Sequence, residues 1–338
     1  MILWICIAIF VALLIIGAPI ILCLGIPPII WLLQNGRVPN MVMGQKMYTA
    51  VDSFSLMAIP FFMLAGQVME RTGITEAIVD FANAVIGWVR GGLACTVELA
   101  GMLMAGISGS SNADASALGA ICLRALKKGG YEEGWAAAIV VSASGIGPII
   151  PPSIIMIVYA TAAGLDIGQL FTAGIVPGIC LGVAYMLVSV NYAKRHNIPK
   201  IPFKGFKHVW ETFKKAIWAL LMPVIIIGGI LGGLFTATEC GVIATVYGVI
   251  YGLIVRKIKP RDLWKSLKEG ILAAVGPISL IAISSIFSYM LAREGVTASI
   301  ANFLETNINS QFGVMGFCAL ICIVAGCFVD GTATMLLL

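Results

Sequence analysis

The sequence has little charge for its length, and this scarcity determines its class. Only 11% of the 338 residues are Asp, Glu, Lys or Arg, whereas 60% are hydrophobic. A typical soluble domain carries roughly 25% charged residues, so these few charges cannot cover a soluble fold. The composition predicts a polytopic membrane protein and excludes a soluble enzyme or a disordered linker protein. The formal net charge of +5 indicates no nucleic-acid partner, because the basic residues lie in short loops between apolar runs.

Histidine is scarce, and the cysteine pairs typical of metal or redox sites are missing. The two histidines, His196 and His208, lie in one basic loop, and none of the nine cysteines belongs to a Cys-x-x-Cys pair. We therefore expect no zinc site, no organic cofactor and no histidine-based catalysis, and we interpret the cysteines as small buried hydrophobic residues. The sequence also lacks the phosphate-binding pattern Gly-x-x-x-x-Gly-Lys-Ser/Thr, so ATP hydrolysis by this chain is not expected. We predict that it is not an enzyme.

Long apolar runs divide the chain into expected membrane helices. The first is expected over roughly 3–33, long or kinked near 25–28. Further spans are expected at about 48–69, 75–89, 134–165, 168–193, 216–236, 239–255 and 270–292. Two stretches do not fit a simple span, because polar residues interrupt 91–126 at 108–114 and glycine and polar residues interrupt 298–338 at 326–334.

Loops rich in lysine and arginine should face the cytoplasm. Placing them there puts the N-terminus outside and requires 91–126 to enter the membrane and turn back at its polar tip. The stretch 298–338 then enters from the outside. Three spans followed by a re-entrant hairpin thus occur twice in opposite orientations, a plan typical of secondary transporters.

The predicted fold is an all-α polytopic membrane protein with two inverted repeats, each with a re-entrant helical hairpin and a broken helix. The first repeat covers 1–193, with its hairpin at about 91–126 and its broken helix at about 134–165. A cytoplasmic amphipathic linker, 194–215, follows; its aromatic residues and lysines recur at helical spacing, as in a helix that lies on the lipid bilayer. The second repeat covers 216–338, with its hairpin starting at about 298.

Three segments break the helical pattern inside apolar surroundings, where irregular backbone is tolerated only if protein buries it or it lines a wet cavity. They are 108–112, 142–153 and 331–334. In the second, prolines interrupt a helix and should free carbonyl oxygens on one side and N–H groups on the other. Carbonyls and hydroxyls suit a hard cation such as Na⁺, and N–H groups suit a carboxylate. The alternatives are a packing kink or a close helix contact.

Asp114 and Asp330 are candidate residues of an ion path, because ionisable residues at membrane depth usually mark such a path. Either could instead cap a helix. At these segments the sequence resembles the large membrane subunit of tripartite ATP-independent periplasmic (TRAP) transporters, the DctM type. The resembling stretches are 106–114, 144–153, 235–239 and 330–334, in the order found in the family.

The resemblance implies a permease subunit of a Na⁺-coupled importer of organic acids in the bacterial or archaeal cytoplasmic (inner) membrane. It implies an elevator mechanism, a small four-helix membrane subunit and a periplasmic substrate-binding protein that delivers the carboxylate. Carried onto this sequence, the expected substrate-binding residues are Ser108, Gly109, Asn112, Asp114, Pro148, Pro151 and Asp330. The expected Na⁺ ligands are Ser110, Ser111, Ser144, Gly145, Gly147, Gly331, Thr332 and Thr334.

One departure from the family concerns the second repeat. In the family this repeat continues to its own broken Pro-Pro helix, whereas this sequence stops at Leu338 within an apolar run. We therefore expect a second repeat truncated at its C-terminus and a second ion site without its partner segment. The alternative function is a stand-alone Na⁺- or H⁺-coupled carboxylate transporter of a related elevator family. The need for a binding protein distinguishes the two.

Overall fold

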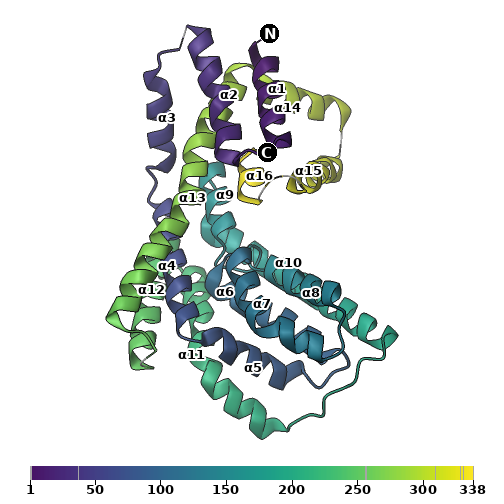
Figure 1. Ribbon diagram of the computed structural model, residues 1–338. Coiled ribbons are helices and arrows are strands. Elements are labelled where there is room, and N and C mark those ends of the chain that lie inside the picture. Colours follow the sequence, from purple (N-terminus) through teal and green to yellow (C-terminus); the bar gives the residue numbers. More distant parts are fainter. Residues whose placement is uncertain are drawn as a thin grey trace. The chain divides into compact units, whose positions relative to one another are not determined.

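The computed structural model describes residues 2–36, 38–255, 257–308, 310–327, 329 and 331–337, and within these ranges it contains helices and no β-strand (Figure 1). In chain order the elements are α1 (Ile2–Ile15), α2 (Ile20–Asn35), α3 (Met41–Val51), η1 (Ser55–Met57), α4 (Ala58–Arg71), α5 (Ile74–Ile86), α6 (Gly92–Ser108), α7 (Ser111–Lys128), α8 (Glu133–Gly145), α9 (Ile154–Ala163), α10 (Ile167–Arg195), α11 (Phe206–Leu231), α12 (Ala237–Ile254), α13 (Pro260–Arg293), α14 (Val296–Asn307), α15 (Gln311–Gly326) and α16 (Gly331–Leu337).

By length and composition, four of the described helices can cross a membrane, namely α10 to α13, and counting one bent pair of helices as a single span raises the number to five. Several shorter apolar helices accompany them, including α1, α6 and α15. An all-helical chain with these apolar elements confirms the predicted class of a polytopic membrane protein. The inverted repeats remain a prediction.

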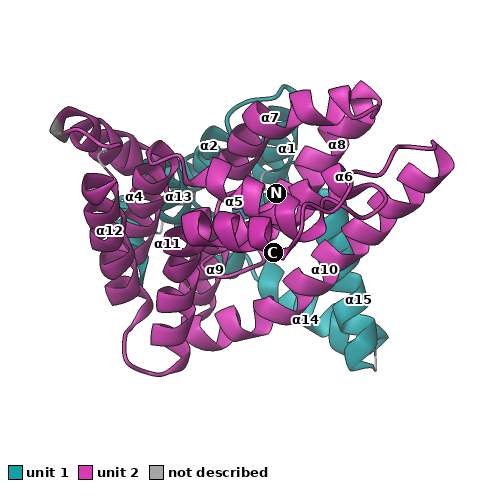
Figure 2. Cartoon of the chain, turned by 90° about the horizontal axis from the view of Figure 1, so that it is seen from below, with its two compact units in different colours: residues 1–56, 275–338 teal, residues 57–274 magenta. Residues whose placement is uncertain are grey.

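The chain divides into two compact units, coloured separately in Figure 2. Unit 1 comprises residues 1–56 and 275–338, and unit 2 comprises residues 57–274. These units group residues by packing, whereas the predicted repeats group them by topology. The repeat boundaries at 193 and 216 are therefore not tested by this division and stay a prediction.

In unit 1, α1 and α2 pack against each other, and α13 supplies the rest of a buried core. Trp31 lies in this core, and its indole Nε1 donates a hydrogen bond to Glu294 Oε1 at 2.7 Å. The ring of Phe287 lies 5.3 Å from that of Phe10. Burial of apolar side chains between these helices stabilises the unit, and the hydrogen bond to Glu294 satisfies the buried indole N–H of Trp31.

The expected single helix over 3–33 is wrong in its detail, because the chain turns earlier than predicted. Gly17 adopts φ +76°, its N–H donates to the Leu14 carbonyl, and the Ala18 N–H donates to the Leu13 carbonyl, both at 3.0 Å. This is the Schellman end of a helix, which a glycine in the left-handed region favours. Pro27 and Pro28, taken as the kink, lie inside α2.

Unit 2 is built around α6, which packs against α4, α5, α7, α8, α10 and α11. Twelve residues of α6 are buried, and six of them are glycine or alanine: Gly92, Ala94, Ala100, Gly101, Ala105 and Gly106. Small side chains let the helix backbones approach closely. At the α6–α8 crossing, a Cβ on Gly101 would lie 2.6 Å from the Ala143 carbonyl oxygen.

Half of the buried residues of this helix therefore have the smallest side chains. This composition explains how a single helix can lie between several neighbours at short range.

Three further boundaries differ from the expected spans. The span expected over 48–69 is interrupted at 52–54, between α3 and η1. The helical part of the expected linker, 194–215, is continuous with the next span, because α11 runs without a break from Phe206 to Leu231. Likewise, α13 begins at Pro260 and includes most of the basic loop expected before the span at 270–292. Polar and charged residues such as lysine and glutamate have good helix propensity, so a helix can continue beyond its apolar part and the membrane boundary need not coincide with the helix boundary.

Replacing Gly101 by alanine should destabilise unit 2, because the new Cβ would overlap the Ala143 carbonyl group of α8. We expect the free energy of unfolding to fall by about 1–3 kcal/mol, as for other overpacked sites, and thermal unfolding of the detergent-solubilised protein measures it. Gly228→Ala is the matched control, because Gly228 also lies within a helix but has no atom within 4 Å of its added Cβ. Equal effects of the two substitutions would contradict the close α6–α8 crossing.

Candidate functional site

Helices α6 and α7 form a folded-back hairpin whose tip is at Gly109 and Ser110. Gly109 ends α6 with φ +58°, and Ser110 precedes α7 in an extended conformation. At the opposite end of the hairpin, a Cβ on Gly129 would lie 2.5 Å from Leu93 Cδ1, so the end of α7 lies beside the start of α6. The structure confirms that this stretch is not one continuous helix. Its entry and exit on one side of a membrane stay a prediction.

Ser108 and Asp114 connect the two arms of the hairpin at its tip. The Ser108 hydroxyl donates to Asp114 Oδ1 at 2.7 Å and accepts the Ser110 N–H at 3.2 Å. Asp114 is fully buried, and its second oxygen, Oδ2, has no hydrogen-bond partner among the described residues. An unpartnered buried oxygen of this kind costs about 1–3 kcal/mol, and more if it is charged. The tip thus holds one acceptor without a donor.

The expected span over 134–165 contains two helices, α8 and α9, separated by residues 146–153, and its role as one broken membrane span stays a prediction. The break contains Pro148, Pro151 and Pro152, which have no N–H to continue a helix. Ser153 closes the break: its Oγ donates to the Pro148 carbonyl at 2.6 Å and accepts the Met156 N–H at 3.2 Å as the N-cap of α9. One fully buried hydroxyl therefore connects the irregular segment to the helix that follows.

The hairpin tip packs directly on this break. A Cβ on Gly109 would lie 2.4 Å from the Pro152 carbonyl oxygen, and a Cβ on Gly147 would lie 2.8 Å from Asp114 Oδ2. The approach at Gly109 is to backbone and its φ is positive, so glycine is required there, whereas the approach at Gly147 is to a side chain. The structure therefore brings Ser108, Gly109, Ser110 and Asp114 together with Gly147 and the prolines of the break.

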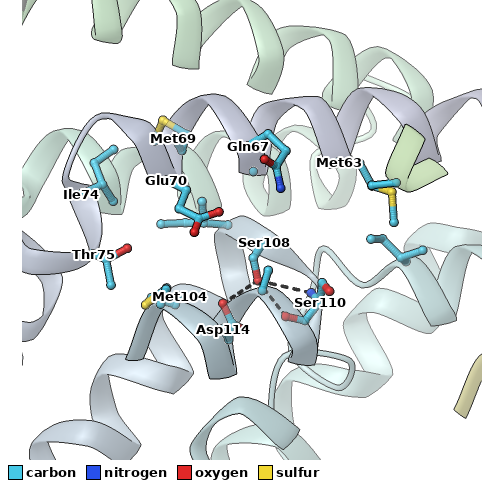
Figure 3. Close-up of a pocket in the computed structure, with 16 residues that line it drawn as sticks. Met63, Gln67, Met69, Glu70, Ile74, Thr75, Met104, Ser108, Ser110 and Asp114 are labelled. Atoms are coloured by element: carbon cyan, nitrogen blue, oxygen red, sulfur yellow. Dashed lines mark hydrogen bonds between the residues drawn. The ribbon is translucent and has the colours of Figure 1, made fainter. Parts of the chain in front are cut away.

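A cavity of about 80 Å³ lies between this tip and α4 (Figure 3). Its polar lining comes from two sources: the hairpin, and the end of α4 together with the start of α5. These residues are Gln67, Glu70, Thr75, Ser108, Ser110 and Asp114. In Figure 3, Gln67 and Glu70 lie on the opposite side of the cavity from Ser108 and Asp114. The unpartnered carboxylate thus borders a space that other oxygen-bearing side chains also reach.

Other predicted residues of the first site lie near the tip or the break but do not line this cavity. Asn112 and Gly145 are exposed, and Ser111 and Pro148 are half-buried. Ser144 is buried, and its hydroxyl donates to the Val141 carbonyl of its own helix at 2.8 Å. Pro151 is buried in the break. These assignments stay predictions.

The remaining predicted residues belong to unit 1. Asp330 lies outside the described residues. Gly331 is exposed at the start of α16, and Thr332 and Thr334 are buried. The Thr334 hydroxyl is 3.4 Å from the Val329 carbonyl oxygen. The second ion site therefore stays a prediction.

Gln67 and Glu70 are the cavity residues that sequence analysis missed. They lie at the end of α4, just where the predicted span 48–69 stops. The available signal was their spacing of three residues, which places both side chains on one face of a helix. Which neighbour that face meets depends on tertiary packing.

Comparison with known proteins identifies the class of the chain as a membrane transporter subunit. Residues 7–338 match the family model described as "Tripartite ATP-independent periplasmic transporter, DctM component". The match covers nearly the whole chain. The chain therefore belongs to the DctM family, the large permease component of these transporters.

Three relatives illustrate the similarity. The chain is 36% identical over 294 residues to the C4-dicarboxylate TRAP transporter large permease protein DctM of Pseudomonas aeruginosa, covering 87% of this chain and 69% of the relative. It is 35% identical over 295 residues to the sialic acid TRAP transporter permease protein SiaT of Haemophilus influenzae, covering 87% and 48%. It is 34% identical over 298 residues to the 2,3-diketo-L-gulonate TRAP transporter large permease protein YiaN of Escherichia coli, covering 88% and 70%. The chain thus spans about half to 70% of the length of these relatives.

Ser153→Ala should loosen the break between α8 and α9, because it removes both hydrogen bonds of a buried hydroxyl. We expect the free energy of unfolding to fall by about 2 kcal/mol, combining the loss of a helix cap and an unpaired carbonyl. Thermal unfolding in detergent measures the change. Thr161→Ala is the control within α9, since that hydroxyl bonds only to the Ile157 carbonyl one turn away. A control effect as large as that of Ser153→Ala would refute the role of the cap.

Proposed function

We propose that the chain is the membrane-embedded permease subunit of a Na⁺-coupled importer of organic acids. The proposal rests on the hairpin tip packed on the broken helix, together with membership of the DctM family. The relatives are named for C4-dicarboxylates, sialic acid and 2,3-diketo-L-gulonate, all of which are carboxylates. The substrate class proposed for this chain is therefore a small organic acid.

The observation that carries the proposed cation site is the free oxygen of Asp114. Asp114 Oδ2 is buried and has no partner among the described residues, and Asp114 lines the cavity together with Gln67 and Glu70. A hard cation is the natural partner for a carboxylate surrounded by oxygen-bearing groups. Na⁺ bound there would remove the cost of the unpaired oxygen. Ser108, which holds the other carboxylate oxygen at 2.7 Å, would fix the orientation of this ligand.

The proposed carboxylate site lies at the start of α7. The first N–H groups of a helix have no acceptor within it and favour an anion. Here the N-cap Ser110 makes no side-chain hydrogen bond to them. A solute carboxylate near Ser111 and Asn112 would accept these N–H groups, while the cation near Asp114 would offset its charge.

The remaining elements of the proposal follow from the family. A periplasmic substrate-binding protein would deliver the solute, and a small four-helix membrane subunit would accompany this chain in the inner membrane. In an elevator mechanism the hairpin and the broken helix would move together and carry the site across the bilayer. One Na⁺ moving down a membrane potential supplies roughly 2.3 kcal/mol per 100 mV, which can drive accumulation without ATP.

Replacing external Na⁺ by K⁺ at a fixed membrane potential should abolish most solute uptake by the complete complex in proteoliposomes. The physical reason is that a larger cation fits the cavity less well and supplies no Na⁺ gradient. Uptake of a radiolabelled C4-dicarboxylate or sialic acid, with the binding protein present, is the measurement. The same uptake rate in K⁺ would refute the proposed Na⁺ coupling. Uptake in the absence of the binding protein would favour a stand-alone carrier.

Asp114→Asn should raise the Na⁺ concentration for half-maximal uptake by roughly tenfold, or about 1.4 kcal/mol, because the amide lacks the charge of the carboxylate. The dependence of the initial uptake rate on Na⁺ concentration measures this shift. Asp80→Asn is the control, since Asp80 is an exposed residue of α5 outside the cavity. Asp80→Asn should leave the Na⁺ dependence of uptake unchanged. If Asp114→Asn also leaves it unchanged, the cation site is not at Asp114.

A further inference from the structure

A second feature of unit 2 lies far along the sequence from the hairpin tip, where α10 ends and α11 begins. Residues 194–215 contain seven lysines and arginines and a single acid, Glu211. The segment 199–205 is not helical and passes beside the end of α5, where the ring of Phe203 lies 5.8 Å from that of Trp88. The segment is thus strongly basic and carries aromatic residues at its contact with α5.

An apolar cavity of about 460 Å³ opens at this contact. Its lining contains no polar side chain and consists of Val85, Trp88, Phe203, Phe206 and Val209. Phe206 is 84% exposed and Trp88 is 48% exposed, although both are large apolar side chains. The cavity therefore has the character of a binding site for a hydrocarbon chain.

A smaller cavity of about 20 Å³ lies next to the apolar one and shares two of its residues, Trp88 and Phe203. Its lining adds Asn83, Lys204 and His208, which are hydrogen-bond donors or carry positive charge. An apolar cavity thus lies beside a smaller one that carries a lysine and two further polar side chains, and the two share an aromatic wall. This arrangement matches a molecule with an acyl chain and an anionic head.

We propose that these two cavities form a binding site for an anionic phospholipid. One acyl chain would occupy the apolar cavity, and the phosphate would lie at Lys204 and His208. Charge complementarity favours this occupant, because basic juxtamembrane segments attract anionic lipids. Aromatic side chains and lysines with apolar stems are also the residues that lie at the level of lipid head groups. The site would anchor the start of α11 to the end of α5 through a lipid.

The test is native mass spectrometry of the full-length chain in its complex, with phosphatidylglycerol or phosphatidylcholine of identical acyl chains added to the micelles. We expect the first phosphatidylglycerol to bind more tightly than phosphatidylcholine. Lys204→Gln should weaken phosphatidylglycerol binding by roughly fivefold, the contribution of one lysine near an anionic head group. Phosphatidylcholine binding should change little.

Two matched controls separate the site from general attraction to lipid. Lys214→Gln removes the same charge from α11, at a lysine that lies over the Trp210 ring and outside both cavities, and should change binding less than about twofold. Phe206→Ala should weaken both lipids equally, whereas Trp210→Ala, also exposed on α11, should weaken neither.

Three results would overturn the proposal. Equal binding of the two lipids by the unmodified protein would show that no anionic head is recognised. Equal losses for Lys204→Gln and Lys214→Gln would show diffuse electrostatic attraction. A photo-crosslinker at position 206 that captures the small membrane subunit or a second copy of the chain, with no lipid bound, would show that protein covers the cavity.

Discussion

Backbone groups that lose their helical partners must find others when little water is available, and this constraint governs the centre of unit 2. Two interruptions, the tip at Gly109 and the break at 146–153, meet each other. Their mutual packing buries irregular backbone against irregular backbone. Ser153 and Ser108 then supply the hydrogen bonds that the helices cannot. The candidate site is thus a product of the same interruptions that make the fold irregular.

This arrangement leaves one acceptor, Asp114 Oδ2, without a donor among the described residues. Gly147 packs closely against this oxygen, since even a Cβ there would lie 2.8 Å from it. The cavity toward α4 is where Gln67 and Glu70 lie. The proposed cation site follows from this asymmetry: one carboxylate oxygen is held by protein and the other is left for a ligand.

The features that sequence analysis located best are those that depend on local chemistry. The tip at Gly109 and Ser110 falls within the predicted interruption, because a glycine followed by serines favours the end of one helix and the start of another. The prolines placed the α8–α9 break correctly. The turn at Gly17 was missed, because Pro27 and Pro28 gave a stronger local signal than one glycine in an apolar run. Gln67 and Glu70 were missed because the side of the cavity that they form depends on which helices pack together.

The glycine contacts between the tip and the break have a mechanical consequence. With Gly109 against the Pro152 carbonyl and Gly147 against Asp114, the two elements interlock with almost no clearance. Sliding one along the other would drive backbone atoms into each other. A displacement of the hairpin along the break would therefore have to open these contacts first or move the break with it.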